Sequence, residues 1–248
     1  MKIVTTTVSK DGYRDPTAFE FRFAAFKEAL ELAKGEGIQL LCLPGGYFCV
    51  ASDAEREKAE SQIVEAAKAA GIAVAVGIDC SQQKLPNKGK ATTPDTSFLV
   101  QTKALPSFAM TWSPQQEKQI WRQRSTTGRD QRLVSDEDCV RPQTLRVSGE
   151  NIEILACGEL FNERIRNSII AGHPDAVVDL SHDGQGFRAD HSMKLLARQG
   201  MHTFCCTHAN KKGAMKRAFA PGGGKTSTPE ADSVITGKPR IEMKIREI

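Results

Sequence analysis

The chain has 248 residues, of which 40% are hydrophobic, so it can bury a full core, and we expect a single domain over residues 1–248. Its 34 basic and 30 acidic residues give a formal charge of +4, spread over most of the chain, and this balance does not call for nucleic acid. The seven cysteines lack the paired spacing of a zinc site, so we expect reduced thiols and no bound metal or cofactor. No apolar stretch reaches bilayer length and no apolar signal core precedes the first strand, so we expect no membrane association and a cytoplasmic location.

The first part of the chain alternates buried strands with helices that have one apolar face. Asp15 is typical of a helix cap, and Pro16 follows at the first helical position, where its missing N–H costs nothing. Ser52 and Glu55 have the spacing of a capping box. Almost entirely apolar runs follow these helices, as expected for strands buried on both faces. The expected elements are strands at 2–8, 39–43, 72–78 and 97–100 and helices at 16–35 and 53–70.

The second part repeats this alternation after a long charged segment. Residues 113–138 are charged and glutamine-rich without a clear period, and we expect a long loop that forms a wall of the site. Beyond it we expect strands at 144–147, 152–156, 175–180, 201–207, 214–219 and 241–245 and helices at 161–171 and 187–199. Two comparable halves suggest two sheets stacked face to face with helices outside, and a site where the strand ends of both halves meet.

Residues 154–163, Ile-Leu-Ala-Cys-Gly-Glu-Leu-Phe-Asn-Glu, resemble the nucleophile segment of the nitrilase superfamily of carbon–nitrogen hydrolases. In that segment an apolar strand ends at a cysteine, an acidic residue follows two places on, and a helix begins. The surrounding layout agrees over nearly the whole chain, including Leu-Cys-Leu-Pro at 41–44 and the strand ends at 178–181 and 207–210. The resemblance implies an α/β fold, the four-layer α-β-β-α sandwich, and a homodimer or higher homo-oligomer.

Chemistry in that family needs a thiol nucleophile, a glutamate base and a lysine that stabilises the developing oxyanion. Cys157 matches the nucleophile. The glutamate normally follows the proline of the second strand, where this sequence has Gly45, and Gln123 stands where the lysine is expected, unless Arg122 or Arg124 supplies the cation. Losing a general base commonly costs about 10²–10⁴ in rate, so we expect ordinary hydrolysis of small amides or nitriles to be impaired.

Other residues near these positions are candidates for the missing roles. His182 follows the strand expected at 175–180, and because a Cys–His pair is a recognised activation device, we consider it a candidate base, although a loop histidine is more often a surface residue. For Glu159, beside Cys157 in sequence, we favour a buried structural hydrogen-bonding role. The residues expected around the substrate pocket are Gly45, Gln123, Arg124, Glu159 and Asp183.

Three functions remain open from the sequence. The first is a divergent thiol hydrolase acting on a small amide, nitrile or ester through Cys157. The second is a non-catalytic pseudo-hydrolase that binds a small molecule or acts as a scaffold. The third is a nucleic-acid-binding protein with a basic patch, which no RNA- or DNA-binding motif supports. Retention of Cys157 favours the first function, and the departures at Gly45 and Gln123 favour the second.

Overall fold

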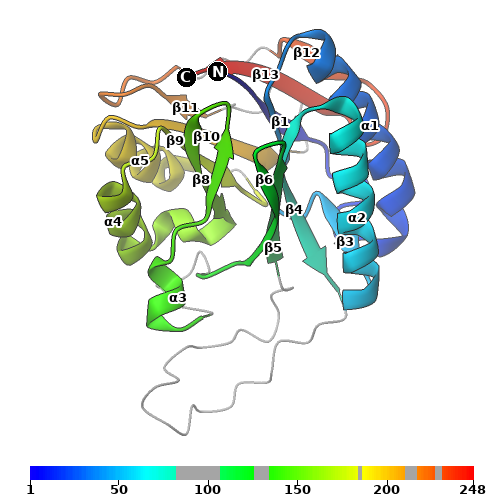
Figure 1. Ribbon diagram of the computed structural model, residues 1–248, viewed down its shortest axis with the longest axis horizontal. Helices are drawn as coiled ribbons and strands as arrows, with labels where there is room; N and C mark the ends of the chain where they lie inside the picture. Colours follow the sequence, from blue (N-terminus) through cyan, green and yellow to red (C-terminus); the bar gives the residue numbers. More distant parts are fainter. Residues whose placement is uncertain (82–106, 126–133, 184–185, 210–216, 227–230) are drawn as a thin grey trace, which may run out of the picture.

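Helices cover both outer faces of a large mixed array of strands (Figure 1). The computed structural model describes residues 1–81, 107–125, 134–183, 186–209, 217–226 and 231–248. The strand expected at 97–100 lies outside these residues. The helices are α1 (Phe19–Gly35), α2 (Asp53–Ala70), α3 (Asp136–Val140), α4 (Glu163–Gly172) and α5 (Gly186–Ala197), with 3₁₀ turns η1 (Pro16–Ala18) and η2 (Cys157–Phe161).

The described strands form one hydrogen-bonded array that folds over on itself. They are β1 (Lys2–Val8), β2 (Leu40–Cys42), β3 (Phe48–Val50), β4 (Ala73–Cys80), β5 (Ser107–Ser113), β6 (Gln116–Arg122), β7 (Thr144–Val147), β8 (Glu150–Ala156), β9 (Ala176–Leu180), β10 (His202–His208), β11 (Ala218–Phe219), β12 (Ser233–Ile235) and β13 (Ile241–Glu247). The order is β6-β5-β4-β2-β1-β10-β9-β8-β7. β1 and β10 join the two halves through the pairs Thr7–Thr207 and Val8–His208.

The central strands of both halves are mutually parallel. Within the order, the six consecutive strands β4, β2, β1, β10, β9 and β8 pair with one another in parallel. The carboxyl ends of all six therefore lie along one edge of the molecule. In open α/β sheets this is the edge at which ligand sites form, because the loops that leave it carry side chains from several strands.

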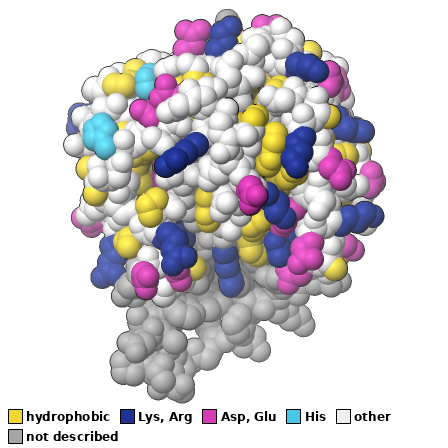
Figure 2. All heavy atoms as spheres, viewed as in Figure 1, with side chains coloured by type: hydrophobic (Ala, Val, Ile, Leu, Met, Phe, Trp, Pro, Cys, Tyr) yellow, Lys and Arg dark blue, Asp and Glu magenta, His cyan; other side chains and the backbone are white. Residues whose placement is uncertain are grey.

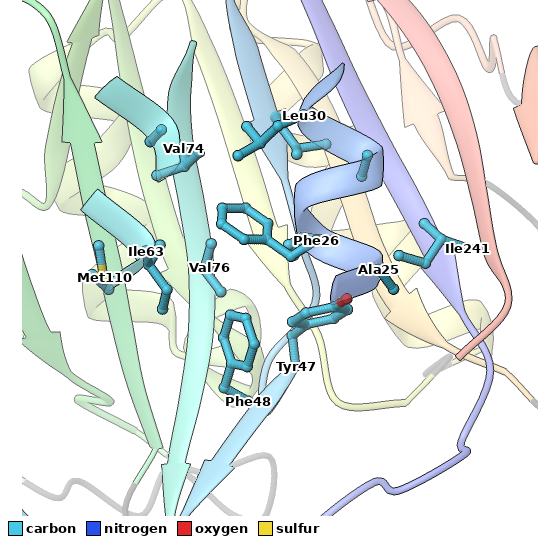
Figure 3. Close-up of a cluster of buried hydrophobic side chains, with 14 of the residues drawn as sticks. Ala25, Phe26, Leu30, Tyr47, Phe48, Ile63, Val74, Val76, Met110 and Ile241 are labelled. Carbon is cyan, nitrogen blue, oxygen red and sulfur yellow. The ribbon is translucent and has the colours of Figure 1, made fainter. Parts of the chain in front are cut away.

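Three buried apolar clusters separate four layers of structure. The first lies between α1, α2 and the first half of the array and includes Phe26, Leu30 and Val76 (Figure 3). The second lies between the two halves, and the third lies between the second half and helices α4 and α5. Successive residues of β8 point to opposite faces of the sheet, since Ile154 belongs to the second cluster and Leu155 to the third. The predicted α-β-β-α sandwich is confirmed.

The two helices of the first half begin with the predicted caps. The Asp15 side chain accepts a hydrogen bond from the Thr17 amide, but the first turn is the 3₁₀ turn η1, so α1 itself starts at Phe19. The Glu55 amide donates to Ser52 Oγ at 3.2 Å, which caps α2.

The expectation of one long loop at 113–138 is wrong. Within that segment β6 pairs with β5 as an antiparallel hairpin, and α3 begins at Asp136. The sequence of β6, Gln-Glu-Lys-Gln-Ile-Trp-Arg, is mostly polar because the strand lies at the end of the array, where its side chains are half-buried or exposed. An edge strand with this composition lacks the apolar alternation that predicts strands.

The outer surface of the molecule carries both signs of charge. Basic and acidic side chains are interspersed over the face shown in Figure 2. Among the described residues, no helix combines the length and the apolar character needed to cross a bilayer.

Candidate active site

Cys157 lies at the turn that follows β8. The strand is buried from Ile152 to Ala156, and η2 begins at the cysteine itself. Cys157 has a φ of 46°, in the left-handed region that a residue with a side chain rarely adopts, and only 6% of its surface is exposed. Strained backbone of this kind persists where the surrounding structure imposes it, and it is common at active sites.

The side chain of His182 connects Cys157 to a buried carboxylate. Its imidazole hydrogen-bonds to the thiol of Cys157, and its Nε2 lies 3.0 Å from Oδ1 and 3.1 Å from Oδ2 of Asp79. Ser107 Oγ lies 3.5 Å from the same nitrogen. Asp79 and Ser107 are 1% and 3% exposed, so water does not compete for these contacts. The arrangement is therefore a Cys–His–Asp chain in which the carboxylate orients the imidazole toward the sulfur.

The electrostatics of the pair favour an ionised thiol. Burial by itself would raise the pKa of Cys157, but the hydrogen bond from His182 and its positive charge outweigh burial, so the pKa is lowered. For His182, burial would lower the pKa, but the charge and hydrogen bond of Asp79, together with Cys157, raise it well above its ordinary value. Cys157 and His182 thus favour the thiolate–imidazolium state.

Gly45 lies directly against His182. A Cβ atom on Gly45 would lie 2.6 Å from the Leu180 carbonyl oxygen and 2.9 Å from His182 Nδ1. At the position where the resemblance expects a glutamate, the imidazole therefore fills the space that a side chain would need. A Cβ on Gly77 of β4 would lie 2.4 Å from Gly45 Cα, so the turn after β2 rests directly on the strand that carries Asp79.

Glu159 and Arg124 form an ion pair behind the Cys157 turn. Glu159 is fully buried and accepts hydrogen bonds from Arg124 Nη2 at 2.9 Å, the Arg124 amide at 2.5 Å and the Ala156 amide at 3.1 Å. Arg124 also donates to the Arg141 carbonyl. These contacts favour a structural role for the pair, which ties the segment after β6 to the strand that ends at the nucleophile. Their contact with substrate stays a prediction.

The remaining predicted pocket residues lie at different depths. Gln123 is buried one strand away from the site: its amide donates to the Ser107 carbonyl, and its side chain donates to the Ser125 carbonyl at 2.7 Å. Asp183 is 57% exposed and pairs with Lys10 at the surface. The structure thus places Gly45 in direct contact with His182, and a role for Gln123 or Asp183 in binding substrate stays a prediction.

Asp79 was not among the site residues predicted from the sequence. It is the single charged residue in an eight-residue strand that is otherwise apolar or glycine, and it stands near the carboxyl end of that strand. A carboxylate in such a position is costly to bury without a partner, so it was a signal for a functional or paired group. Among the described residues, no group of three or more histidine, cysteine or acidic side chains could hold a metal ion.

The sequence matches no family model and no curated protein. Solved structures of an amidase from Nesterenkonia sp. AN1, from the nitrilase superfamily, superpose on the whole molecule. One has a TM-score of 0.70 at 15% identity, covering 100% of this chain and 92% of that chain. Another, which shows covalent addition of the acetamide moiety of fluoroacetamide at the active site cysteine of that amidase, has a TM-score of 0.67 at 15% identity, covering 98% of this chain and 89% of that chain. The protein described here therefore has the fold of a nitrilase-superfamily amidase.

Proposed function

We propose that the protein is a thiol hydrolase that cleaves the carbon–nitrogen bond of small amides. In this proposal Cys157 is the nucleophile, His182 carries the proton and Asp79 holds the imidazole in place. The observation that carries the proposal is the hydrogen-bonded chain from Cys157 to His182, whose Nε2 lies 3.0 Å from Asp79 Oδ1 in a buried site. The fold supports amides as the substrate class, since the solved structures that share it are those of an amidase with an active site cysteine.

The first half-reaction forms a thioester. The thiolate of Cys157 attacks the amide carbonyl carbon, so that a C–S bond forms and the carbonyl electron pair moves onto oxygen. The imidazolium of His182 donates its proton to the leaving nitrogen as the C–N bond breaks, and the amine or ammonia departs. The carbonyl re-forms as a thioester, and His182 is left neutral beside Asp79.

The second half-reaction uses the same histidine as a base. Neutral His182 takes a proton from water as the water oxygen attacks the thioester carbon. The C–S bond then breaks, the carboxylic acid leaves, and the thiolate–imidazolium pair is restored. One histidine thus serves as acid and then as base, which is the work that a glutamate performs in the family that the sequence resembles.

The test is hydrolysis by the full chain of small aliphatic amides and activated acetate esters, with mass spectrometry of acyl adducts. We expect a Cys157 adduct in the wild type, none in Cys157→Ala, and a rate loss of about 10²–10⁴ in His182→Ala. Cys139 supplies the matched control, because it lies in the third apolar cluster, between the second half of the array and helices α4 and α5. The Cys139→Ala variant should form the acyl adduct like the wild type. Absence of Cys157-dependent turnover in a folded protein would contradict the proposal.

The second candidate function is a non-catalytic small-molecule-binding or scaffold protein. It is favoured by the glycine at position 45, where the resemblance leads us to expect a glutamate. It would be supported by small amides that protect Cys157 from alkylation but are not turned over. A homodimer or higher homo-oligomer stays a prediction of the resemblance, which light scattering on the purified chain would check.

A further inference from the structure

We propose that the hydroxyl of Tyr13 binds the carbonyl oxygen of the substrate and stabilises the negative charge that develops there when Cys157 attacks. This inference rests on the proposed function and names the electrophilic group that a lysine supplies in the resembling family. Tyr13 precedes η1, in the loop that leaves the carboxyl end of β1.

The Tyr13 hydroxyl is a buried polar group without a hydrogen-bond partner among the described residues. Its oxygen is shielded from solvent, and none of the described residues hydrogen-bonds to it. A buried hydroxyl in that condition is unusual, because desolvation is not offset by a hydrogen bond. Burial raises the pKa of Tyr13, so the group remains a neutral O–H donor. A ligand oxygen would supply the missing acceptor.

The ring of Tyr13 lies beside the groups of the site. Its centroid is 4.5 Å from that of the His208 ring and 6.3 Å from that of the His182 ring. The guanidinium of the next residue, Arg14, lies over the Tyr13 ring, and its Nε is 4.0 Å from Asp79 Oδ2. The tyrosine therefore stands among the same histidine and aspartate that act on Cys157.

The loop that carries Tyr13 is fixed by buried hydrogen bonds. Arg22, 1% exposed, donates from Nε to the Asp11 carbonyl at 3.0 Å and from Nη1 to the Tyr47 carbonyl at 2.6 Å. The Tyr13 amide donates to the Lys10 carbonyl at 3.0 Å. The hydroxyl is thus held in place before substrate arrives, as electrostatic stabilisation of a transition state requires.

The Arg124 guanidinium, which the sequence suggested as a possible oxyanion-binding cation, is paired with a carboxylate. Arg124 is bound to Glu159, so its guanidinium serves the structure behind the turn. A neutral hydroxyl suits the site because it can bind an oxyanion and still leave Cys157 and His182 as the ion pair. In the addition step the C–S bond forms, the electron pair of the carbonyl moves to oxygen, and Tyr13 donates a hydrogen bond to that oxygen without transferring its proton.

The test uses a small aldehyde, which adds reversibly to a thiolate and leaves an oxygen where the oxyanion would form. Propanal should protect Cys157 from alkylation by iodoacetamide. In Tyr13→Phe we expect protection, measured relative to the alkylation rate of the same variant without propanal, to require at least about tenfold more propanal.

The second tyrosine of the chain supplies the matched control. The Tyr47 hydroxyl donates to the Arg22 carbonyl at 2.8 Å, so Tyr47→Phe should lower the melting temperature and leave propanal protection unchanged. Tyr13→Phe removes a hydroxyl that has no hydrogen-bond partner in the described part of the chain, so it should not lower the melting temperature. Equal protection in wild type and Tyr13→Phe would overturn the role of Tyr13 alone, whereas failure of propanal to protect the wild type would contradict the proposed function as well.

Discussion

Cys157 owes its acidity to its neighbours rather than to the turn that carries it. Burial alone would raise the pKa of this thiol, and His182 reverses the direction through a hydrogen bond and its charge. His182 can remain protonated while buried because Asp79 compensates its charge. The protonation of Cys157 therefore depends on His182, and that of His182 depends on Asp79.

Asp179 of β9 is a buried carboxyl group whose pKa is higher than that of an ordinary surface aspartate. Burial, followed by the charges of Cys157 and Glu159, raises its pKa well above the usual range, and its Oδ1 has no hydrogen-bond partner among the described residues. The folded protein therefore holds a proton that the unfolded chain releases near pH 3.9. Stability from this group is fully present below that pH and is lost as the pH rises toward the folded pKa.

We expect Asp179→Asn, which mimics the protonated acid, to unfold like the wild type near pH 3.5 and to be more stable at pH 7. The difference should grow by up to about 1.4 kcal/mol per pH unit between the two pKa values. Urea unfolding of both proteins across pH 3.5–8 measures it. A constant difference over that range would show that Asp179 does not bind a proton on folding.

Asp232 provides a control of opposite sign. Burial would raise its pKa, but hydrogen bonds from Lys244 Nζ and the Ile245 amide lower it below the usual value. Its stabilising contribution is present above the unfolded pKa and is lost as the pH falls through the folded pKa. Asp232→Asn should therefore be less stable than the wild type at pH 7, and the gap should close on acidification.

Single residues were predictable where the local sequence carries the signal. Cys157 follows from an apolar strand that ends at a cysteine, and the favoured structural role of Glu159 agrees with its three buried hydrogen bonds. Asp79 was not predicted as a partner of His182, because 103 positions separate the two residues and their contact depends on how the halves of the array pair. Sequence periodicity does not report such pairing.

At the scale of elements, the close packing of the turn after β2 limits which side chains fit into the site. It lies so close to β4 and to the end of β9 that Gly45 has no room for a Cβ atom, while His182 occupies the adjacent space. The lack of a side chain at position 45 and the position of the His182 imidazole are therefore parts of one packing arrangement. The sequence alone suggested only a loss.

Restoring a glutamate at Gly45 should fail. A Cβ there would overlap the Leu180 carbonyl oxygen, a backbone atom that cannot move alone, so we expect Gly45→Ala to lower the free energy of unfolding by about 1–3 kcal/mol and Gly45→Glu by more. Gly35→Ala is the matched control, because nothing lies within 4 Å of its Cβ and alanine favours helix. Urea unfolding tests the three variants. A stable, more active Gly45→Glu would contradict the packing described for this turn.

Elements with strong local signals were predicted, and weak ones were not. The capping residues Ser52 and Asp15 and the apolar runs of β2 and β4 gave helices and strands close to the observed ones. β6 was missed because an edge strand can be polar on both faces. The helix expected at 161–171 is α4 (Glu163–Gly172), which begins two residues later because Asn162 accepts a hydrogen bond from the Ile165 amide and caps it.

At the scale of the whole molecule, parallel pairing of six strands brings the site together. Asp79 lies near the end of β4, Cys157 follows β8 and His182 follows β9. The β1–β10 pairing aligns the carboxyl ends of both halves. The order of helices and strands in the sequence predicted the layers, since apolar faces must be covered. It did not predict that the catalytic candidates from the two halves would meet as a Cys–His–Asp chain.

The central claim is that His182 and Asp79 hold Cys157 as a thiolate. The most direct measurement is the rate of Cys157 alkylation by iodoacetamide against pH, in the wild type, His182→Ala and Asp79→Asn. We predict an acid limb below the usual thiol pKa of about 8.5 in the wild type and above it in His182→Ala, where the hydrogen bond and charge of His182 no longer offset burial. The acid limb of Asp79→Asn should lie between the two. The same acid limb in the wild type and in folded His182→Ala would contradict the central claim.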